Sequence, residues 1–181
     1  MKKFFTFIAA AALAMSAFAT DYAGKITVEV NGEGSTQDAT IQINQNEDGT
    51  YNLNIKNFRL INESTTLDVG NIVLDNMKGY TINGLTTIVA DQIINIQDGD
   101  DPSVPMWMGP LLGDVPIIMA TQFDGTKAKV DIDINMSALQ QLINVKFETP
   151  DYNGKYGDVD GDGYVNSSDI TIVYGILLGT K

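Results

Sequence analysis

The chain contains neither cysteine nor histidine in its 181 residues. Without cysteine it can form no disulfide bond, and it has no thiol nucleophile or thiolate metal ligand. Without histidine, Ser-His-Asp triads and the usual zinc sites are excluded as well. An enzyme made from this sequence would have to work through carboxylates alone, so we expect a protein that is not an enzyme.

Basic residues are also scarce. Eleven Lys and Arg residues stand against 23 Asp and Glu residues, which gives a formal net charge of -12 at pH 7. Such a charge repels nucleic-acid phosphates and anionic lipid surfaces, and it favours the binding of cations. We therefore expect no nucleic-acid partner. No apolar run reaches the ~20 residues needed to cross a bilayer, so we also expect no membrane span.

The first 19 residues have the pattern of a secretory signal peptide. Lys2 and Lys3 form a basic start, residues 4–14 are apolar, and residues 17–19 (Ala-Phe-Ala) form a small-x-small cleavage site. The pattern predicts an exported protein, located in the periplasm, on the outer surface or in the medium.

Residues 20–150 show the alternation of apolar and polar residues that is typical of β-strands. The clearest case is the segment 128–136, and about eight such segments follow one another, joined by turn signals such as Asp48-Gly49. Near Phe58 the alternation slips by one residue, which predicts either a β-bulge or the end of the strand. Without helices to cross over, the strands must be antiparallel. We predict an all-β protein with an antiparallel up-and-down barrel of about eight strands, and a two-sheet sandwich is the alternative.

One apolar segment departs from this alternation. Residues 101–114 are rich in proline and glycine, yet they contain Met106, Trp107 and Met108. A loop this apolar must pack against something. One interpretation is that it plugs one end of the barrel as part of the core. The other is that Met106, Trp107 and Met108 form a flap over a ligand cavity.

Residues 151–181 form a linker and a C-terminal module with the spacing of a calcium-binding loop. The twelve residues from Asp158 read DVDGDGYVNSSD, which places carboxylates at loop positions 1, 3, 5 and 12 and a glycine at position 6. This is the ligand spacing of an EF-hand-type loop, in which position 7 coordinates through its backbone carbonyl. The predicted Ca²⁺ ligands are Asp158, Asp160, Asp162, Tyr164, Asn166 and Asp169.

The loop leads into an apolar helix in which Ile170, Val173 and Leu177 recur at helical spacing. Residues 157–179 resemble one repeat of a type I dockerin, the calcium-binding module that attaches to cohesins in bacterial polysaccharide-degrading systems. The resemblance implies that Ser167 and Ser168, at loop positions 10 and 11, help to choose a partner. Dockerins carry two repeats, whereas one is found here. The single repeat could therefore bind a cohesin-like partner, another copy of itself or its own barrel.

The preceding region is similar to the calycin-like β-barrel domains of secreted Bacteroides proteins. The resemblance runs over most of residues 22–147 and rests on Lys25-Ile-Thr-Val, the hairpin around Asp48-Gly49, the Met106-Trp-Met-Gly-Pro segment and the alternating aspartates from Asp131. It implies a lipocalin-related barrel with room for a small apolar ligand. From the alternation along the strands, side chains such as those of Ile132, Ile134, Met119 and Phe123 are expected to line the interior.

These observations favour an exported, non-catalytic binding protein, whose barrel holds a small hydrophobic or saccharide ligand and whose tail is a calcium-dependent attachment module. A structural or adhesive cell-surface subunit is the alternative. A glycosidase ranks below both, because it needs paired carboxylates with one pKa raised by burial. The pair Asp131 and Asp133 and the cluster Asp98, Asp100 and Asp101 are predicted to be solvated.

Overall fold

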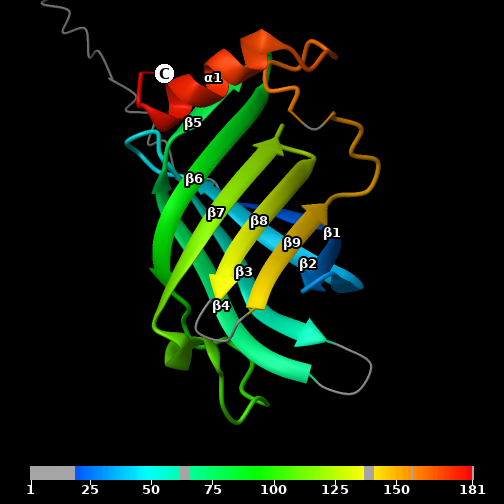
Figure 1. The fold of residues 1–181 in the computed structure, drawn as a ribbon, viewed down its shortest axis with the longest axis vertical. Helices are drawn as coiled ribbons and strands as arrows, with labels where there is room; N and C mark the ends of the chain where they lie inside the picture. Colours follow the sequence, from blue (N-terminus) through cyan, green and yellow to red (C-terminus); the bar gives the residue numbers. More distant parts are fainter. Residues whose placement is uncertain (1–18, 62–65, 137–140, 156, 181) are drawn as a thin grey trace, which may run out of the picture.

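The computed structural model describes residues 19–61, 66–136, 141–155 and 157–180. The predicted signal peptide, apart from Ala19, lies outside these ranges. Within these ranges the chain forms one antiparallel sheet of nine strands, a short 3-10 helix and one α-helix (Figure 1). The elements are β1 Ala19–Val30, β2 Glu33–Gln45, β3 Tyr51–Ile61, β4 Thr66–Met77, β5 Gly79–Ile82, β6 Leu85–Asn95, η1 Gly109–Leu112, β7 Asp114–Phe123, β8 Ala128–Met136, β9 Gln141–Glu148 and α1 Ser167–Leu177.

The strand order is that of an up-and-down barrel. Except for β4 and β5, neighbours in the chain are neighbours in the sheet, and β1 pairs with β9, which gives the order β4-β3-β2-β1-β9-β8-β7-β6-β5. The two outer strands, β4 and β5, are separated in the chain by Lys78 alone, so the sheet must curl until its edges approach each other. Asn71 of β4 and Gln97 beyond β6 exchange two backbone hydrogen bonds of 2.9 and 3.1 Å across this seam. The predicted antiparallel up-and-down architecture is therefore confirmed, with nine strands in the described residues where about eight were expected.

A glycine makes the seam possible. Gly70 has φ +125°, and a Cβ atom at this position would collide with the backbone carbonyl of Gln97. Only glycine adopts this conformation without strain and also lets another backbone approach so closely.

Tight turns connect several strands. The predicted hairpin at Asp48-Gly49 joins β2 to β3, and the Asp48 carboxylate accepts hydrogen bonds from the N–H and hydroxyl of Thr50 at 2.9 and 2.6 Å. Asn31-Gly32 and Asn83-Gly84 form two-residue turns with φ positive at both positions. This is the conformation for which Asn-Gly is the preferred dipeptide.

The inward face of the sheet is a continuous apolar core. The residues predicted to line the interior, Ile132, Ile134, Met119 and Phe123, are all buried in it. Aromatic rings make contact across the interior, since Phe123 of β7 packs edge-on against Tyr22 of β1 and Tyr51 of β3, with ring centroids 6.2 and 5.5 Å apart. Side chains from opposite walls therefore fill this part of the barrel.

The predicted bulge in β3 is confirmed. The register of β3 with β4 shifts between Ile55 and Phe58, and Asn57 adopts a left-handed conformation with φ 53°. Asparagine is tolerated in this region because its short amide forms local hydrogen bonds. Here its Oδ1 accepts the backbone N–H groups of Asp100 and Asp101 at 2.7 and 3.1 Å, so the bulge is tied to the loop after β6.

We expect Asn57→Ala to lower the free energy of unfolding by about 3–4 kcal/mol. The loss combines two hydrogen bonds of about 1 kcal/mol each with roughly 1–2 kcal/mol of left-handed strain at a residue that carries Cβ. Asn57→Gly loses the same hydrogen bonds without the strain, so it should be the milder change by about 1 kcal/mol. Urea denaturation of both variants measures the difference, and equal losses would refute the contribution of strain.

Helix α1 lies across the end of the sheet at β5 and β6, opposite the end where η1 lies (Figure 1). Ile172 and Ile176 are buried together with Val159, and Tyr80 and Val173 pack against them. The exposed side of the helix carries Ile170, Tyr174, Leu177 and Leu178. Of the three residues that recur at helical spacing in the sequence, Ile170 and Leu177 thus face solvent. Among the described residues, no helix combines the length and apolarity that crossing a membrane requires.

Candidate metal centre

The acidic loop before α1 is held against the barrel by its backbone. Gln122 of β7 donates its Nε2 hydrogen to the carbonyl of Asp158 at 2.7 Å, and the Thr87 hydroxyl of β6 lies 3.5 Å from the carbonyl of Val159. The Tyr152 hydroxyl donates to the Gln122 Oε1 at 3.2 Å, and burial raises the pKa of Tyr152 to about 12. The linker, two barrel strands and the acidic loop are therefore connected by polar contacts.

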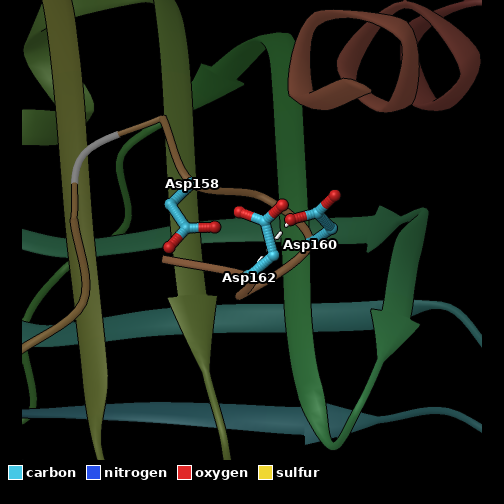
Figure 2. A group of neighbouring side chains, drawn as sticks. All are labelled: Asp158, Asp160 and Asp162. Carbon is cyan, nitrogen blue, oxygen red and sulfur yellow. Dashed lines mark hydrogen bonds between the residues drawn. The ribbon is translucent and has the colours of Figure 1, made fainter. Parts of the chain in front are cut away.

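Three carboxylates converge in this loop. Asp158, Asp160 and Asp162 each have an oxygen within 4.8 Å of the others (Figure 2). Asp158 is the buried member, with 7% of its surface exposed. Three of the oxygens accept backbone N–H groups within the loop: Asp158 Oδ2 from Gly163 at 2.9 Å, Asp160 Oδ1 from Asp162 at 3.1 Å, and Asp162 Oδ1 from Tyr164 at 2.7 Å.

The other oxygen of Asp158 has no such partner. Asp158 Oδ1 is buried and accepts no hydrogen bond. Burying a carboxylate oxygen without a donor or a cation is costly, because the group loses its hydration and gains nothing in exchange. The donor set around it consists of carboxylate oxygens, which suit a hard cation such as Ca²⁺.

Asn166 and Asp169, also predicted as ligands, form the cap of α1. Asp169 Oδ1 accepts the N–H of Val159 at 2.6 Å, and its Oδ2 accepts the N–H of Asn166 at 2.7 Å. The amide oxygen of Asn166 accepts the N–H of Ser168 at 2.7 Å, which completes a capping box. The N–H groups of Asn166, Val159 and Asp160 hold the pKa of the Asp169 carboxyl below its ordinary value. In this geometry Asp169 clamps the first and last parts of the loop together.

The remaining predicted positions face outward. The Tyr164 side chain is exposed, and the Lys155 ammonium lies 5.7 Å from the centre of its ring while donating to the Gly163 carbonyl at 2.6 Å. Ser167 and Ser168 are exposed in the first turn of α1. The proposed partner-selecting serines therefore lie on an accessible surface.

The apolar loop at the other end of the molecule is fixed to β3 and β4. Trp107 is buried, whereas Met106 is 60% exposed. The Arg59 guanidinium lies 5.8 Å from the indole centre, and a Cβ atom at Gly99 would collide with the ring. The N–H of Met108 donates to the carbonyl of Asp68 at 2.8 Å. These contacts favour the interpretation in which Trp107 is part of the packed structure.

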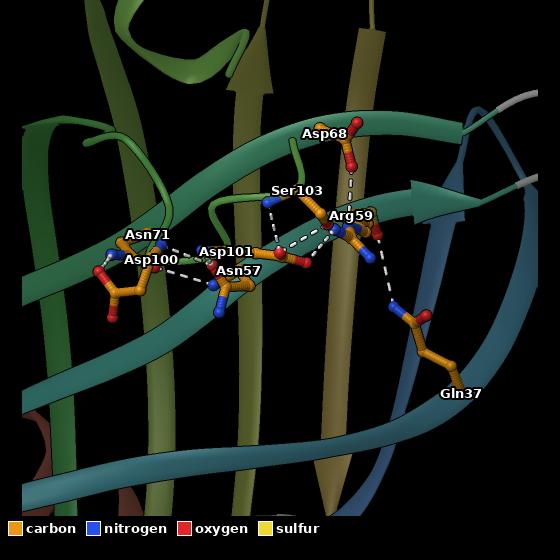
Figure 3. Close-up of polar contacts among 8 residues, drawn as sticks. All are labelled: Gln37, Asn57, Arg59, Asp68, Asn71, Asp100, Asp101 and Ser103. Carbon is orange, nitrogen blue, oxygen red and sulfur yellow. Dashed lines mark hydrogen bonds and ion pairs between the residues drawn. The ribbon is translucent and has the colours of Figure 1, made fainter. Parts of the chain in front are cut away.

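Arg59 is the centre of the polar contacts that hold this loop (Figure 3). It pairs with Asp68 at 2.7 Å and with Asp101 at 2.9 Å. Asp101 in turn accepts the hydroxyl and N–H of Ser103 at 2.6 and 2.9 Å. The Ser103 hydroxyl and N–H, with Arg59 beside them, hold the pKa of the Asp101 carboxyl below its ordinary value of 3.8.

The lowered pKa of Asp101 predicts that the contacts of this loop weaken in acid. Because its folded-state pKa is lowered, the stabilisation is present above pH 3.8 and is lost as the pH falls through the folded value. We expect the fluorescence of Trp107 to stay constant from pH 7 to about 4 and to change below that. In Asp101→Asn this acid step should be absent. A wild-type transition centred above about pH 5 would contradict the assignment.

Four of the five carboxylates considered for glycosidase chemistry have structural partners. Asp131 and Asp133 lie on the outward face of β8, where the Asn144 amide donates to both at 2.9 Å. Asp100 accepts the Asn71 amide at 3.1 Å, and Asp101 pairs with Arg59. The geometry therefore offers these carboxylates structural partners.

Several residues of both sites were not anticipated from the sequence. They are Gln122, Thr87 and Tyr152 around the acidic loop, and Asn57, Arg59 and Asn71 around the Trp107 loop. For Arg59 a signal existed, since it is a lone arginine beside the predicted bulge. For Gln122 and Thr87 none existed, because polar residues on an alternating strand look alike.

Comparison with known proteins agrees with the fold. Residues 18–149 match the family model of the calycin-like beta-barrel domain, and the chain belongs to this family. A crystal structure from Bacteroides fragilis, provisionally described as that of an outer membrane protein, is similar with a TM-score of 0.51 and 14% identity. The similarity covers 74% of this chain and 50% of the other, so the chain spans half the length of that neighbour. No curated protein matches the sequence significantly.

Proposed function

We propose that this chain is an exported, non-catalytic binding protein whose calycin-like barrel carries a calcium-binding loop and helix at its C-terminus. The calycin-like fold supports a binding role. The observation that carries the calcium site is the buried, unpartnered Oδ1 of Asp158 among three converging carboxylates.

The charges of the cluster favour a cation. Three carboxylates with oxygens within 4.8 Å repel one another, and the loop places no lysine or arginine side chain in salt-bridge contact with them among the described residues. A bound Ca²⁺ would supply the missing positive charge and fill the coordination sphere with oxygens.

The chain offers enough oxygen ligands. Asp158, Asp160 and Asp162 would provide carboxylate oxygens and Tyr164 its carbonyl, as the loop spacing predicts. Asp169 and Asn166 already accept backbone N–H groups, but a carboxylate offers about four lone-pair directions, so Asp169 retains capacity for a cation.

The same contacts give the loop a role in holding the tail. Asp169 clamps the loop, Val159 is buried beside Ile172 and Ile176, and Gln122 binds the Asp158 carbonyl. A short module of this size cannot build its own core, so neutralising its carboxylates should strengthen the docking of α1 on β5 and β6.

Isothermal titration calorimetry of the chelator-treated full chain tests the site directly. We expect one Ca²⁺ per chain with a clear preference over Mg²⁺, because the smaller ion requires stricter octahedral geometry. Asp158→Asn should abolish the heat of binding, and Asp91→Asn, at an exposed position of β6, should leave it unchanged. Absence of calcium binding by the wild-type chain at millimolar concentration would refute the site.

A second function, attachment to a partner protein, is favoured by the exposed face of α1. Ile170, Tyr174 and Leu177 are 58, 62 and 52% exposed on consecutive turns, next to Ser167 and Ser168. Together with the dockerin-like sequence, this supports binding to a cohesin-like domain and a link to polysaccharide-degrading systems.

Capture by an immobilised type I cohesin tests the attachment. We expect binding that requires calcium and that Ile170→Asn weakens at least tenfold, whereas Ile118→Asn, an exposed isoleucine on β7, should have no effect. Self-association detected by sedimentation without cohesin binding would favour the structural alternative. The signal-peptide pattern and the Bacteroides neighbour support export, to the periplasm, the outer surface or the medium.

A further inference from the structure

A break in the sheet lies between β2 and β3. These strands pair only from Ile41 to Gln45 on β2 and from Tyr51 to Ile55 on β3. Beyond Ile41, residues 33–40 of β2 remain paired with β1, and residues 58–61 of β3 remain paired with β4, but the two segments have no register with each other. The Gln37 amide reaches across to the Arg59 carbonyl at 3.4 Å (Figure 3). Beyond the last paired residues, a side-chain hydrogen bond from Gln37 thus replaces the backbone pairing between β2 and β3.

The bulge in β3 accounts for the break. A bulge bends a strand and increases its twist, and this one begins where pairing with β2 ends. Asn57 holds the bent strand to the N–H groups of Asp100 and Asp101, and Arg59 adds its pair with Asp101. The opening is therefore maintained by several contacts with the loop after β6.

The opening is a cleft of about 760 Å³. Its walls are β1, β2 and β3, and Gly24, Gln37, Ala39, Ile55 and Phe58 are among the residues that line it. This volume lies within the range of about 300–1,000 Å³ that is usual for ligand sites.

The lining has no spare positive charge. Lys25 pairs with Asp38 at 2.6 Å, Lys56 with Asp100 at 3.8 Å, and Arg59 with two aspartates. An anionic ligand would have to compete with these carboxylates. What the cleft does offer is the facing edges of two strands and the Oδ1 of Asn54, which is buried and accepts no hydrogen bond.

We propose that the cleft receives an extended peptide segment, which displaces the Gln37 amide from the Arg59 carbonyl, inserts between β2 and β3 and pairs with the backbone edges that these strands do not share with each other. Unpaired strand edges are templates for an added strand, whose backbone N–H and C=O groups supply affinity. Alternate side chains of the peptide would face Ala39 and Phe58, and an N–H donor would reach Asn54. The inference deepens the binding function proposed above by naming a ligand class, and it is independent of the calcium site.

A peptide library tests this inference on the full chain. The probe is a pool of blocked octapeptides in which Val or Thr alternates with Ser, Lys or Glu, selected on the immobilised protein and identified by mass spectrometry. We expect selected peptides to slow amide hydrogen exchange at least fivefold in residues 33–40 and 56–61. N-methylation of alternate peptide residues should weaken their binding at least tenfold, because it removes the backbone donors.

A matched pair of variants locates the site. Ala39→Trp fills the cleft and should weaken peptide binding at least tenfold, whereas Ala120→Trp, on the exposed face of β7, should not. Peptide binding should persist in EGTA and in Asp158→Asn. A failure of the peptide inference can therefore be told apart from a failure of the proposed calcium site. The inference is overturned if no peptide is retained, if N-methylated peptides bind equally well, or if maltohexaose, and not peptide, slows exchange in these segments.

Discussion

Calcium is expected to raise the melting temperature of the wild-type chain, and Asp158→Asn is expected to abolish that rise. The substitution removes one charge from the carboxylate cluster and preserves the shape of the side chain. Its amide oxygen can still accept the N–H of Gly163, so the loop keeps that hydrogen bond. What is lost is the buried Oδ1, the oxygen that has no other partner in the structure.

The size of the effect follows from mass action. At a calcium concentration 100 times the dissociation constant, binding to the folded state alone adds about 2.7 kcal/mol to the free energy of unfolding. For a chain of this length that corresponds to a rise of roughly 5–11 °C in the melting temperature. Differential scanning calorimetry in EGTA and in calcium measures it, and Asp91→Asn is the control for loss of a surface charge.

The pattern of transitions is also informative. If α1 and the acidic loop unfold together with the barrel, calcium should shift a single transition. If the tail unfolds first, calcium should shift only the earlier transition, and Asp158→Asn should remove that shift. Identical wild-type curves in EGTA and in calcium would show that the loop is an acidic turn and not a metal site.

Trp107→Ala is expected to lower the free energy of unfolding by about 3–5 kcal/mol, the usual cost of truncating a buried large aromatic side chain. Trp107 is 7% exposed, packs over Gly99 and lies beneath Arg59. Its loss should also free Arg59 and loosen the contacts that this residue makes with Asp68 and Asp101.

Met106→Ala provides the comparison, because Met106 is the neighbouring apolar side chain and is 60% exposed. Its truncation should change stability by less than about 0.5 kcal/mol. Urea denaturation measures both, with circular dichroism as the readout because the tryptophan itself is removed. A small cost for Trp107→Ala, similar to that of Met106→Ala, would restore the interpretation of residues 106–108 as a movable flap.

The strands could be predicted because their information is local. Alternation along 128–136 indicates one buried and one exposed face wherever the strand lies, and Asp48-Gly49 has few conformations besides a tight hairpin turn. The slip near Phe58 is visible for the same reason, since a bulge displaces every later side chain by one position. Asn31-Gly32 carries an equally local signal for the hairpin between β1 and β2.

The long-range contacts around the acidic loop and Trp107 could not be predicted from local sequence patterns. Gln122 binds the carbonyl of a residue 36 positions away, and Thr87 lies near one 72 positions away. Arg59 meets Asp101 across 42 positions. Strand register decides which of these distant residues become neighbours. A change of register by one residue would turn each side chain to the opposite face of the sheet.

The spacing of carboxylates in residues 158–169 is a property of the chain alone, because odd positions of a tight loop converge whatever surrounds it. Alternation, charge and composition likewise indicate an antiparallel β protein that favours cations. Only the folded barrel decides that Asp158 is buried, that Trp107 is packed and that β2 and β3 separate at Asn57. Burial and strand separation depend on which distant segments become neighbours, and local sequence periodicity does not contain that information.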